Sequence, residues 1–434
     1  MNRLFLSRLF SQREVWTLPV AAFSITSGIA YMVVGGAAWF FRIEGELAGL
    51  YMVLAAVALV LLTVPMVLLM ASSARLMARR RDERLSSLRL LGASGRQLRG
   101  LALAESAVLA VAGVVGGAVL YLALMPLVGL LPFAGERMGV DGLWMGPLML
   151  VGTAAVLVLV AVASAAVGMR RIEITPLGVR TRTLPARVHW VRLLVAGAGF
   201  VIAQTLAQVL GVGSMAVVLT MVLAAIAVPL VAIHLLGPWV LKIVTGWQLR
   251  RAGTAERLIA ARSVLESPQQ MWQQVGGVAI TTYVGVIAGA GMGLASLGAS
   301  GSVDPTDLML LGDVQRGVLL TLAVSFVMTA CAVGISQTAQ VLDRRDLYSS
   351  LAKMGFELPQ LAAIRRLAVM RSLLAVVLIA VLAAASTALP LVGAAVLLAP
   401  ASAATVAGVL VLGVLVVLLG VLASRPTLRR VIAV

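Results

Sequence analysis

The sequence predicts an all-α integral membrane protein with about ten transmembrane helices, and three observations lead to this fold class. The chain is 61% hydrophobic and 12% charged, and a soluble domain carries roughly twice that charged fraction. Its apolar residues form long stretches, each sufficient to cross a hydrocarbon core of about 30 Å as a helix. Its basic residues, finally, lie almost entirely at one side of these stretches.

Ten apolar stretches have the length of a membrane-spanning helix. We expect these helices at residues 17–41, 47–76, 101–131, 143–169, 191–210, 215–241, 275–297, 318–341, 367–389 and 401–423. Residues 1–16 precede the first of them and mix arginines with leucines and phenylalanines. That composition is typical of an amphipathic helix on the cytoplasmic surface of a membrane.

The distribution of charge predicts the orientation in the membrane. With the N-terminus inside, all but three of the 34 Lys and Arg residues fall on the inner side, and the exceptions are Arg42, Arg137 and Arg316. Short loops rich in Lys and Arg stay in the cytoplasm, so we expect both termini there. The net charge of +17 is therefore a signal of topology and does not indicate binding of nucleic acid. The preference for Arg over Lys suggests a bacterial protein, and hence the bacterial cytoplasmic membrane.

An internal repeat divides the chain into two halves. The sequence VAAFSITS at 20–27 is similar to VGGVAITT at 275–282, and RDERLSSL at 81–88 is similar to RRDLYSSL at 344–351. Because an even number of spans separates the copies, the halves are expected to be parallel repeats. The predicted organisation is a surface helix at 1–16, a four-helix repeat at 17–170, a connector with two linking helices at 171–247, and a second four-helix repeat at 248–434.

The inner segment between the second and third stretches has the features of a helix-turn-helix elbow. Leu85, Leu88 and Leu91 recur at helical spacing among arginines, Gly92 permits the positive φ that ends a helix, and Ser94 can cap the next one. A similar segment follows the eighth stretch. We expect both to dock a cytoplasmic partner, through Arg81, Leu85, Leu88, Leu91, Gly92, Ala93 and Ser94 in the first elbow (79–98) and Arg344, Leu351, Gly355 and Phe356 in the second elbow (344–361).

The first elbow, RRRDERLSSLRLLGASGRQL, resembles the signature of the FtsX-like permease family. The layout resembles the ten-helix permeases of antimicrobial-peptide resistance transporters, with FtsX-like segments at 47–170 and 316–424. The resemblance implies two copies of a separate cytoplasmic ABC ATPase, which bind ATP and Mg, and a second permease subunit, identical or homologous, among membrane lipids. Several relatives have a large extracellular domain, whereas the outer loops at 42–46 and 298–313 are too short for one.

Other residues are candidates for substrate contact or helix packing. Gln204 and Gln208 lie four apart on the fifth stretch, and Ser325 and Thr329 lie four apart on the eighth. They either line a substrate cleft or hydrogen-bond neighbouring helices, and the sequence leaves both possibilities open. Small residues spaced by four predict close contact between helix backbones, here at Gly113 and Gly117 and at Gly285, Gly289 and Gly293. No residue pattern indicates a catalytic centre, a metal site or a cofactor held by this chain.

These observations predict the permease subunit of an ATP-driven transporter. A chain without a phosphate-binding Gly-x4-Gly-Lys-Ser/Thr loop needs a separate ATPase. The missing outer domain favours an amphipathic substrate that reaches the protein from the bilayer, such as a lipid, a lipopeptide or an antimicrobial peptide. One alternative is a signalling module that passes ATPase motion to an envelope or sensor protein. Another is an ion-driven transporter, which the scarcity of acidic residues within the spans disfavours.

Overall fold

The fold was obtained as a computed structural model of the 434-residue chain. It describes residues 13–45, 47–90, 95–170, 215–298, 305–343, 350, 353–355, 357–387, 393 and 400–423. Within these ranges almost every residue is helical, apart from one two-stranded hairpin and short turns. The predicted all-α membrane fold is confirmed.

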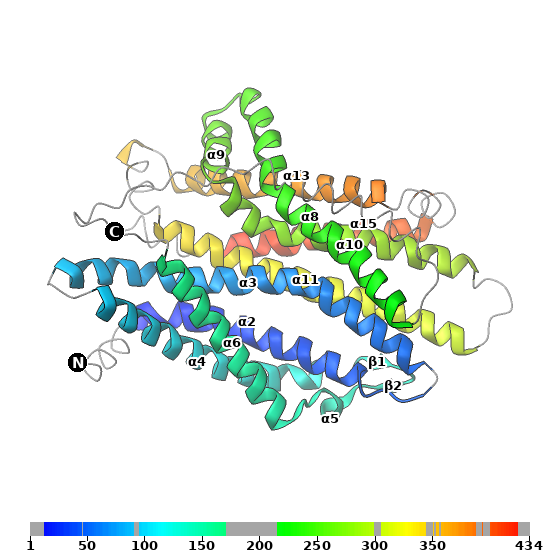
Figure 1. Ribbon diagram of the computed structural model, residues 1–434. Helices are drawn as coiled ribbons and strands as arrows, with labels where there is room; N and C mark the ends of the chain where they lie inside the picture. Colours follow the sequence, from blue (N-terminus) through cyan, green and yellow to red (C-terminus); the bar gives the residue numbers. More distant parts are fainter. Residues whose placement is uncertain are drawn as a thin grey trace. The chain divides into compact units, whose positions relative to one another are not determined.

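Long helices dominate the described residues (Figure 1). They are α2 (Arg13–Phe40), α3 (Ala48–Leu90), α4 (Gly95–Val128), α5 (Gly139–Leu143), α6 (Gly146–Arg170), α8 (Met215–Arg250), α9 (Ala255–Glu266), α10 (Pro268–Gly298), α11 (Pro305–Asp343), α13 (Leu358–Thr387) and α15 (Pro400–Ala423). Eight of the described helices are long and apolar enough to cross a membrane, and α15 has a shorter apolar segment. A helix suits these apolar sequences because it satisfies its own backbone hydrogen bonds where water is absent.

The helix positions agree with nine of the ten predicted stretches. The tenth, at 191–210, lies outside the described residues, as does the surface helix expected at 1–16, so the count of ten stays a prediction. α3 continues beyond the predicted span to Leu90, in agreement with the helix predicted at the start of the first elbow. Two features differ from expectation. α11 begins at Pro305, within the predicted outer loop, and a separate helix, α9, lies between α8 and α10.

The chain forms two compact units. The first comprises Met1–Tyr51 and Leu69–Thr183, and the second comprises Met52–Leu68 and Leu184–Val434, so α3 contributes to both. α2, α4 and α6 belong to the first unit, and α8 to α15 belong to the second. The stretch that we expected to be a linking helix is α8, and within the second unit it packs against α9, α10 and α13.

In the first unit α2 packs along α4, and α4 also contacts α6. Two glycines of α4 allow the close approach to α2. A Cβ atom on Gly113 would lie 2.7 Å from Cβ of Phe23, and one on Gly117 would lie 2.7 Å from the backbone nitrogen of Gly28. Ser27 then joins the helices, because its hydroxyl donates to the carbonyl oxygen of Gly113 at 3.0 Å.

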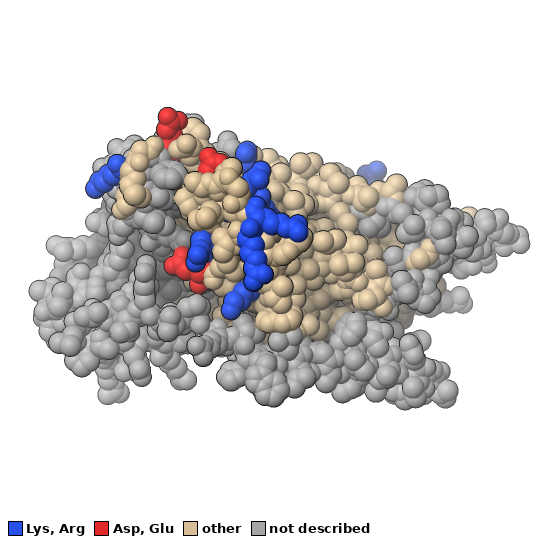
Figure 2. All heavy atoms as spheres, turned by 90° about the horizontal axis from the view of Figure 1, so that it is seen from above, with Lys and Arg blue, Asp and Glu red and all other residues tan. Residues whose placement is uncertain are grey.

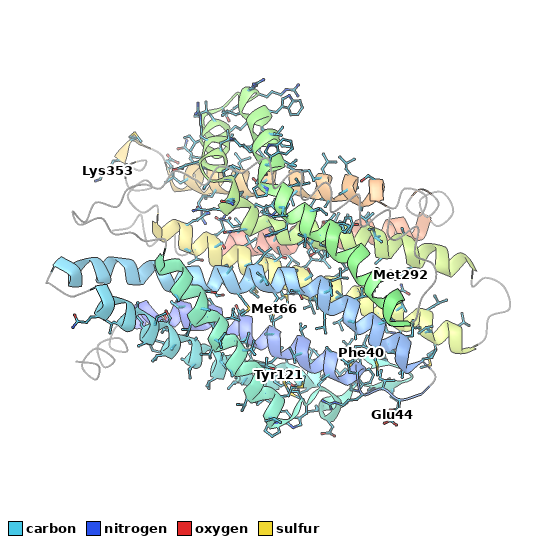
Figure 3. The ribbon with its side chains drawn as sticks, in the orientation of Figure 1. Phe40, Glu44, Met66, Tyr121, Met292 and Lys353 are labelled. Carbon is cyan, nitrogen blue, oxygen red and sulfur yellow. The ribbon has the colours of Figure 1, made fainter. Side chains whose placement is uncertain are left out.

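A small ordered cap closes the outer end of the first unit. Strands β1 (Pro132–Phe133) and β2 (Glu136–Arg137) pair in antiparallel fashion. The two residues between them both have positive φ, as a type I′ turn requires. Phe40, at the end of α2, lies 5.2 Å from Phe133 between ring centroids, and Figure 3 shows it near Glu44 at this end of the ribbon. The Tyr121 hydroxyl donates to the carbonyl oxygen of Leu143.

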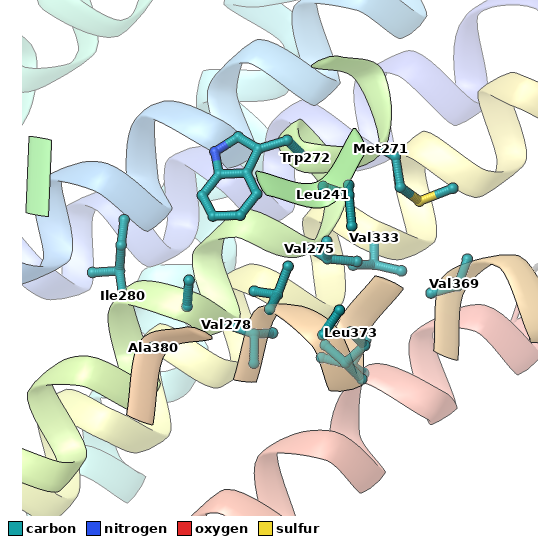
Figure 4. Packing of buried hydrophobic residues seen from close by; sticks show 14 of the residues in the cluster. Leu241, Met271, Trp272, Val275, Val278, Ile280, Val333, Val369, Leu373 and Ala380 are labelled. Atoms are coloured by element: carbon teal, nitrogen blue, oxygen red, sulfur yellow. The ribbon is translucent and has the colours of Figure 1, made fainter. Parts of the chain in front are cut away.

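In the second unit α10 is the central helix and contacts α8, α11, α13 and α15. Its core residues form a continuous apolar cluster with those helices, part of which is drawn in Figure 4. Trp272 is the largest buried side chain. Gly237 of α8 leaves the space for its indole ring, since a Cβ there would lie 2.1 Å from Cζ2. The indole Nε1 donates to Nδ1 of His234 at 3.3 Å.

Candidate coupling elbows and buried polar network

The first elbow begins as a rigid continuation of a membrane span. The apolar part of α3 ends near Ser73, yet the same helix continues to Leu90. At about 1.5 Å per residue, this α3 extension (residues 74–90) is roughly 25 Å long. It carries the predicted elbow residues Arg81, Leu85 and Leu88. A displacement of the extension would therefore be passed directly to the span, since no flexible joint separates them.

The turn of the first elbow lies outside the described residues, which include neither Leu91 nor Gly92, Ala93 and Ser94. The next helix, α4, begins at Gly95, directly after that turn. The order of elements agrees with the sequence prediction: a long helix is followed by four residues and then by a second helix.

The described part of the second elbow is a turn before α13. Gly355 has a φ of +92°, in the region that L-residues with side chains rarely adopt. The backbone N–H of Glu357 donates to Oε1 of Gln360 at 3.0 Å, so a side chain from the first turn satisfies a donor at the helix start. The exposed side chains at this turn include Met354, which is 67% accessible. Arg344, Leu351 and Phe356 lie outside the described residues.

Ser325 and Thr329 of α11 are buried against α10. The Ser325 hydroxyl shares a hydrogen bond with that of Thr281, and a Cβ on Gly277 would lie 2.4 Å from Oγ1 of Thr329. The Ser325 hydroxyl thus joins two helices, whereas the Thr329 hydroxyl donates to the carbonyl oxygen of Ser325 on its own helix at 2.9 Å. Gln204 and Gln208, the other residues proposed for a cleft, lie outside the described residues.

A threonine–serine hydroxyl pair joins the first two spans of each half, although only the threonines are equivalent in the repeat, since Ser73 aligns with Ser336. Thr26 of α2 pairs with Ser73 of α3, with 2.9 Å between the oxygens, and Thr281 of α10 pairs with Ser325 of α11. Thr26 and Thr281 are equivalent in the sequence repeat. In each half, therefore, the first span is held to the second by a threonine–serine contact within the bundle.

Three polar side chains from three helices form a buried polar network in the second unit, namely Gln274 (α10), Gln337 (α11) and Arg365 (α13). Nε2 of Gln337 donates to Oε1 of Gln274 at 2.7 Å. Oε1 of Gln337 accepts from Nη2 of Arg365 at 3.1 Å. Both amides are buried, and Arg365 is only 8% exposed although it lies within a candidate membrane span. Charged residues in such a place are costly and usually functional.

Sequence reasoning missed the special position of Arg365, which it treated as one more basic residue at the inner side. The spacing of apolar residues along α13 could have predicted that Arg365 is buried. Leu361, Ile364, Ala368 and Ser372 are buried and define one face of the helix. Arg365 falls within that face at helical spacing, whereas Arg366 is exposed.

The glycines with predicted packing roles differ in their surroundings. Gly113 and Gly117 contact α2 within the first unit. Gly285 has space for ordinary contact, since a Cβ there would lie 3.4 Å from the Leu322 side chain of α11. Gly289 and Gly293 are buried on the same helix, α10.

Comparison with known families identifies one segment. Residues 50–176 match the family described as the FtsX-like permease C-terminal domain. The match begins at the start of α3, ends just after α6 and includes the first elbow. The second FtsX-like segment, expected at 316–424, stays a prediction. No curated protein and no solved structure matches the chain at a significant level of similarity.

Proposed function

We propose that this chain, a multi-pass membrane protein with an FtsX-like permease domain, is the membrane subunit of an ATP-driven ABC transporter. FtsX-like permeases generally pair with cytoplasmic ABC ATPases. We propose two copies of such an ATPase beneath two permease subunits. The chain would lie in a bacterial cytoplasmic membrane with both termini inside, in agreement with its charge asymmetry.

The α3 extension is the observation that best supports this function. It lies inside the segment that matches the permease family, and it is one helix with a membrane span. An ATPase that binds its inner end could move the inner part of the span with it, because the helix is continuous from Leu90 to Pro65, where a proline interrupts the backbone hydrogen bonds. The second elbow offers an equivalent contact at the exposed turn around Gly355.

The substrate that we propose is amphipathic and dissolved in the membrane, such as a lipid, a lipopeptide or an antimicrobial peptide. The outer segments that the structure describes are short. α2 and α3 are joined by a few residues, and α4 and α6 by the small cap of hairpin and α5. Since neither segment can form a separate domain that captures a ligand from water, lateral access from the bilayer is the simplest route.

The test is ATP hydrolysis by the complex in lipid nanodiscs. The tagged chain would be purified from its host membrane, the co-isolated subunit labelled with a photoreactive ATP analogue, and vanadate-sensitive hydrolysis measured with a lysophospholipid, a cationic lipopeptide and a hydrophilic peptide. We expect the first two to stimulate hydrolysis and the third to have no effect. Failure to isolate any ATP-binding subunit would contradict the proposed function.

Charge reversal links hydrolysis to the first elbow. Replacing Arg79, Arg80 and Arg81 together by Glu should reduce co-isolated ATPase activity at least tenfold without changing membrane insertion. The control is Arg42→Glu with Arg137→Glu, two exposed arginines on the opposite side of the membrane. If hydrolysis depends on the elbow but no amphiphile changes it, the signalling alternative takes the place of transport.

A further inference from the structure

α9 lies where the chain leaves and re-enters the membrane. The candidate span of α8 ends at Arg250 and that of α10 begins at Pro268, with the helix Ala255–Glu266 between them. α9 packs against α8 and α13, and its buried residues Ala260 and Val264 belong to the core of the second unit. α9 is thus fixed against α8 and α13, beside the connection between the two spans.

The opposite face of α9 is both basic and apolar. Arg257 and Arg262 are exposed, and Leu258 between them is 47% exposed. Thr254 caps the helix by accepting from the backbone N–H of Arg257 at 3.4 Å. Long cationic side chains beside an apolar one can reach lipid phosphates while the apolar side chain contacts acyl chains.

Neighbouring helices extend the basic region around α9. Figure 2 looks onto this side of the second unit and shows Lys and Arg side chains gathered in a band. The α9 basic surface consists of six exposed residues, Lys242, Arg250, Arg251, Arg257, Arg262 and Arg366. Glu256, Glu266 and Glu357 lie on the same elements, so six cations face three carboxylates. Positive charge is therefore in excess on this surface.

Aromatic and aliphatic side chains accompany the cations. The Arg251 guanidinium lies 3.8 Å from the ring centroid of Trp247, whose side chain is 56% exposed. Ile243, one turn earlier on α8, is also exposed. Tryptophan is enriched at the membrane–water interface, because its ring is apolar and its N–H needs a polar partner. A water-soluble acidic protein would leave these apolar groups exposed to water, whereas acyl chains below a phosphate layer would cover them.

We infer that the α9 basic surface binds the phosphate groups of anionic phospholipids in the inner leaflet. The cations of α8, α9 and α13 contact the headgroup phosphates, and Ile243, Trp247 and Leu258 contact the adjoining acyl chains. Bound lipid would hold α9 against the membrane. This binding belongs to the chain alone, so it does not depend on the proposed transport function or on an ATPase.

The experiment is native mass spectrometry of the full chain, purified in detergent and mixed with equal amounts of phosphatidylglycerol and phosphatidylcholine. We expect preferential retention of phosphatidylglycerol. Each Lys or Arg near a membrane surface contributes about fivefold to the binding of anionic lipid. Arg257→Gln with Arg262→Gln should therefore lower retention of phosphatidylglycerol about 25-fold, whereas the same two positions changed to Lys should keep it within about twofold.

Two controls make the result decisive. Arg42→Gln with Arg137→Gln removes the same charge from the outer side and should leave lipid retention unchanged. Lys242→Gln with Arg366→Gln tests the surface through α8 and α13 if the α9 variant does not fold. Equal retention of both lipids, or no loss in either inner variant, would overturn the inference. So would a variant that keeps phosphatidylglycerol but loses a co-isolated protein, because the surface would then be a protein-docking site.

Discussion

The guanidinium of Arg365 on α13 donates a hydrogen bond to the side-chain oxygen of Gln337 on α11, within a candidate membrane span. Gln337 uses its amide nitrogen to bind Gln274 of α10 at the same time. One side chain therefore joins three helices of the second unit. In the sequence repeat, α10, α11 and α13 correspond to α2, α3 and α4, and the position equivalent to Arg365 is Ala102. Because alanine has no polar side chain, the Arg365–Gln337 hydrogen bond has no equivalent at Ala102.

Removing Gln337 should destabilise the second unit. In Gln337→Leu the amide of Gln274 and the guanidinium of Arg365 each lose a partner, which should lower the free energy of unfolding by about 1–3 kcal/mol. The measurement is SDS-induced unfolding in mixed micelles. The double variant Gln337→Leu with Arg365→Met should lower the free energy of unfolding by less than the sum of the two single variants, because the two side chains interact. The control is Arg366→Met, because Arg366 is the next residue of the helix but is exposed. If the effects of Gln337→Leu and Arg365→Met on the free energy of unfolding are strictly additive, the contact between the two side chains contributes nothing to stability.

Adding one methyl group at Gly117 should separate α2 from α4. The new Cβ would lie 2.0 Å from Oγ of Ser27 and 2.7 Å from the backbone nitrogen of Gly28, so the helices must move apart. We expect Gly117→Ala to lower the midpoint of thermal unfolding, at a cost of about 1–3 kcal/mol. Gly100→Ala on the same helix meets no atom within 4 Å and serves as the control. Equal midpoints for the two variants would contradict the observed packing.

Substitutions at Gly355 should rank by their tolerance of positive φ. Asn adopts this conformation more readily than Ala, and a β-branched Val least of all, with a penalty of about 1–2 kcal/mol for a residue with a side chain. Hydrogen exchange at the backbone amides of Glu357 and Leu361 should accelerate in the order Asn, Ala, Val, because the turn positions the start of α13. Identical exchange in the three variants would show that the turn does not control the helix start.

Breaking the α3 extension should uncouple ATP hydrolysis from the permease. Proline at Ser86 lacks the backbone donor and clashes with the preceding turn, which costs about 3 kcal/mol within a helix. We expect Ser86→Pro to reduce substrate-stimulated hydrolysis at least tenfold, measured in nanodiscs, while membrane insertion is retained. Ser86→Ala keeps the helix and should behave like the unchanged chain. Full stimulation in the proline variant would show that the continuous helix is not required.

The family match and the helix positions could be anticipated because both depend on local sequence. Apolar stretches long enough to span a membrane predicted nine of the described helices to within a few residues at most of their ends. The continuation of α3 to Leu90 agrees with the helix predicted for the start of the first elbow. α9 was missed, since its twelve residues are too few and too polar to register as a span.

The sequence by itself determined the membrane class and the asymmetric distribution of charge, and it predicted the two elbows, because hydropathy, charge and glycine spacing act through neighbours along the chain. Only the tertiary structure decided that Arg365 is buried while Arg366 is exposed, that Ser325 hydrogen-bonds Thr281 of α10, and that Thr329 packs against Gly277. Those outcomes depend on how each helix is rotated and which helix lies beside it. Hydropathy contains no such information, because a transmembrane helix is apolar on the faces that contact lipid as well as on those that contact protein.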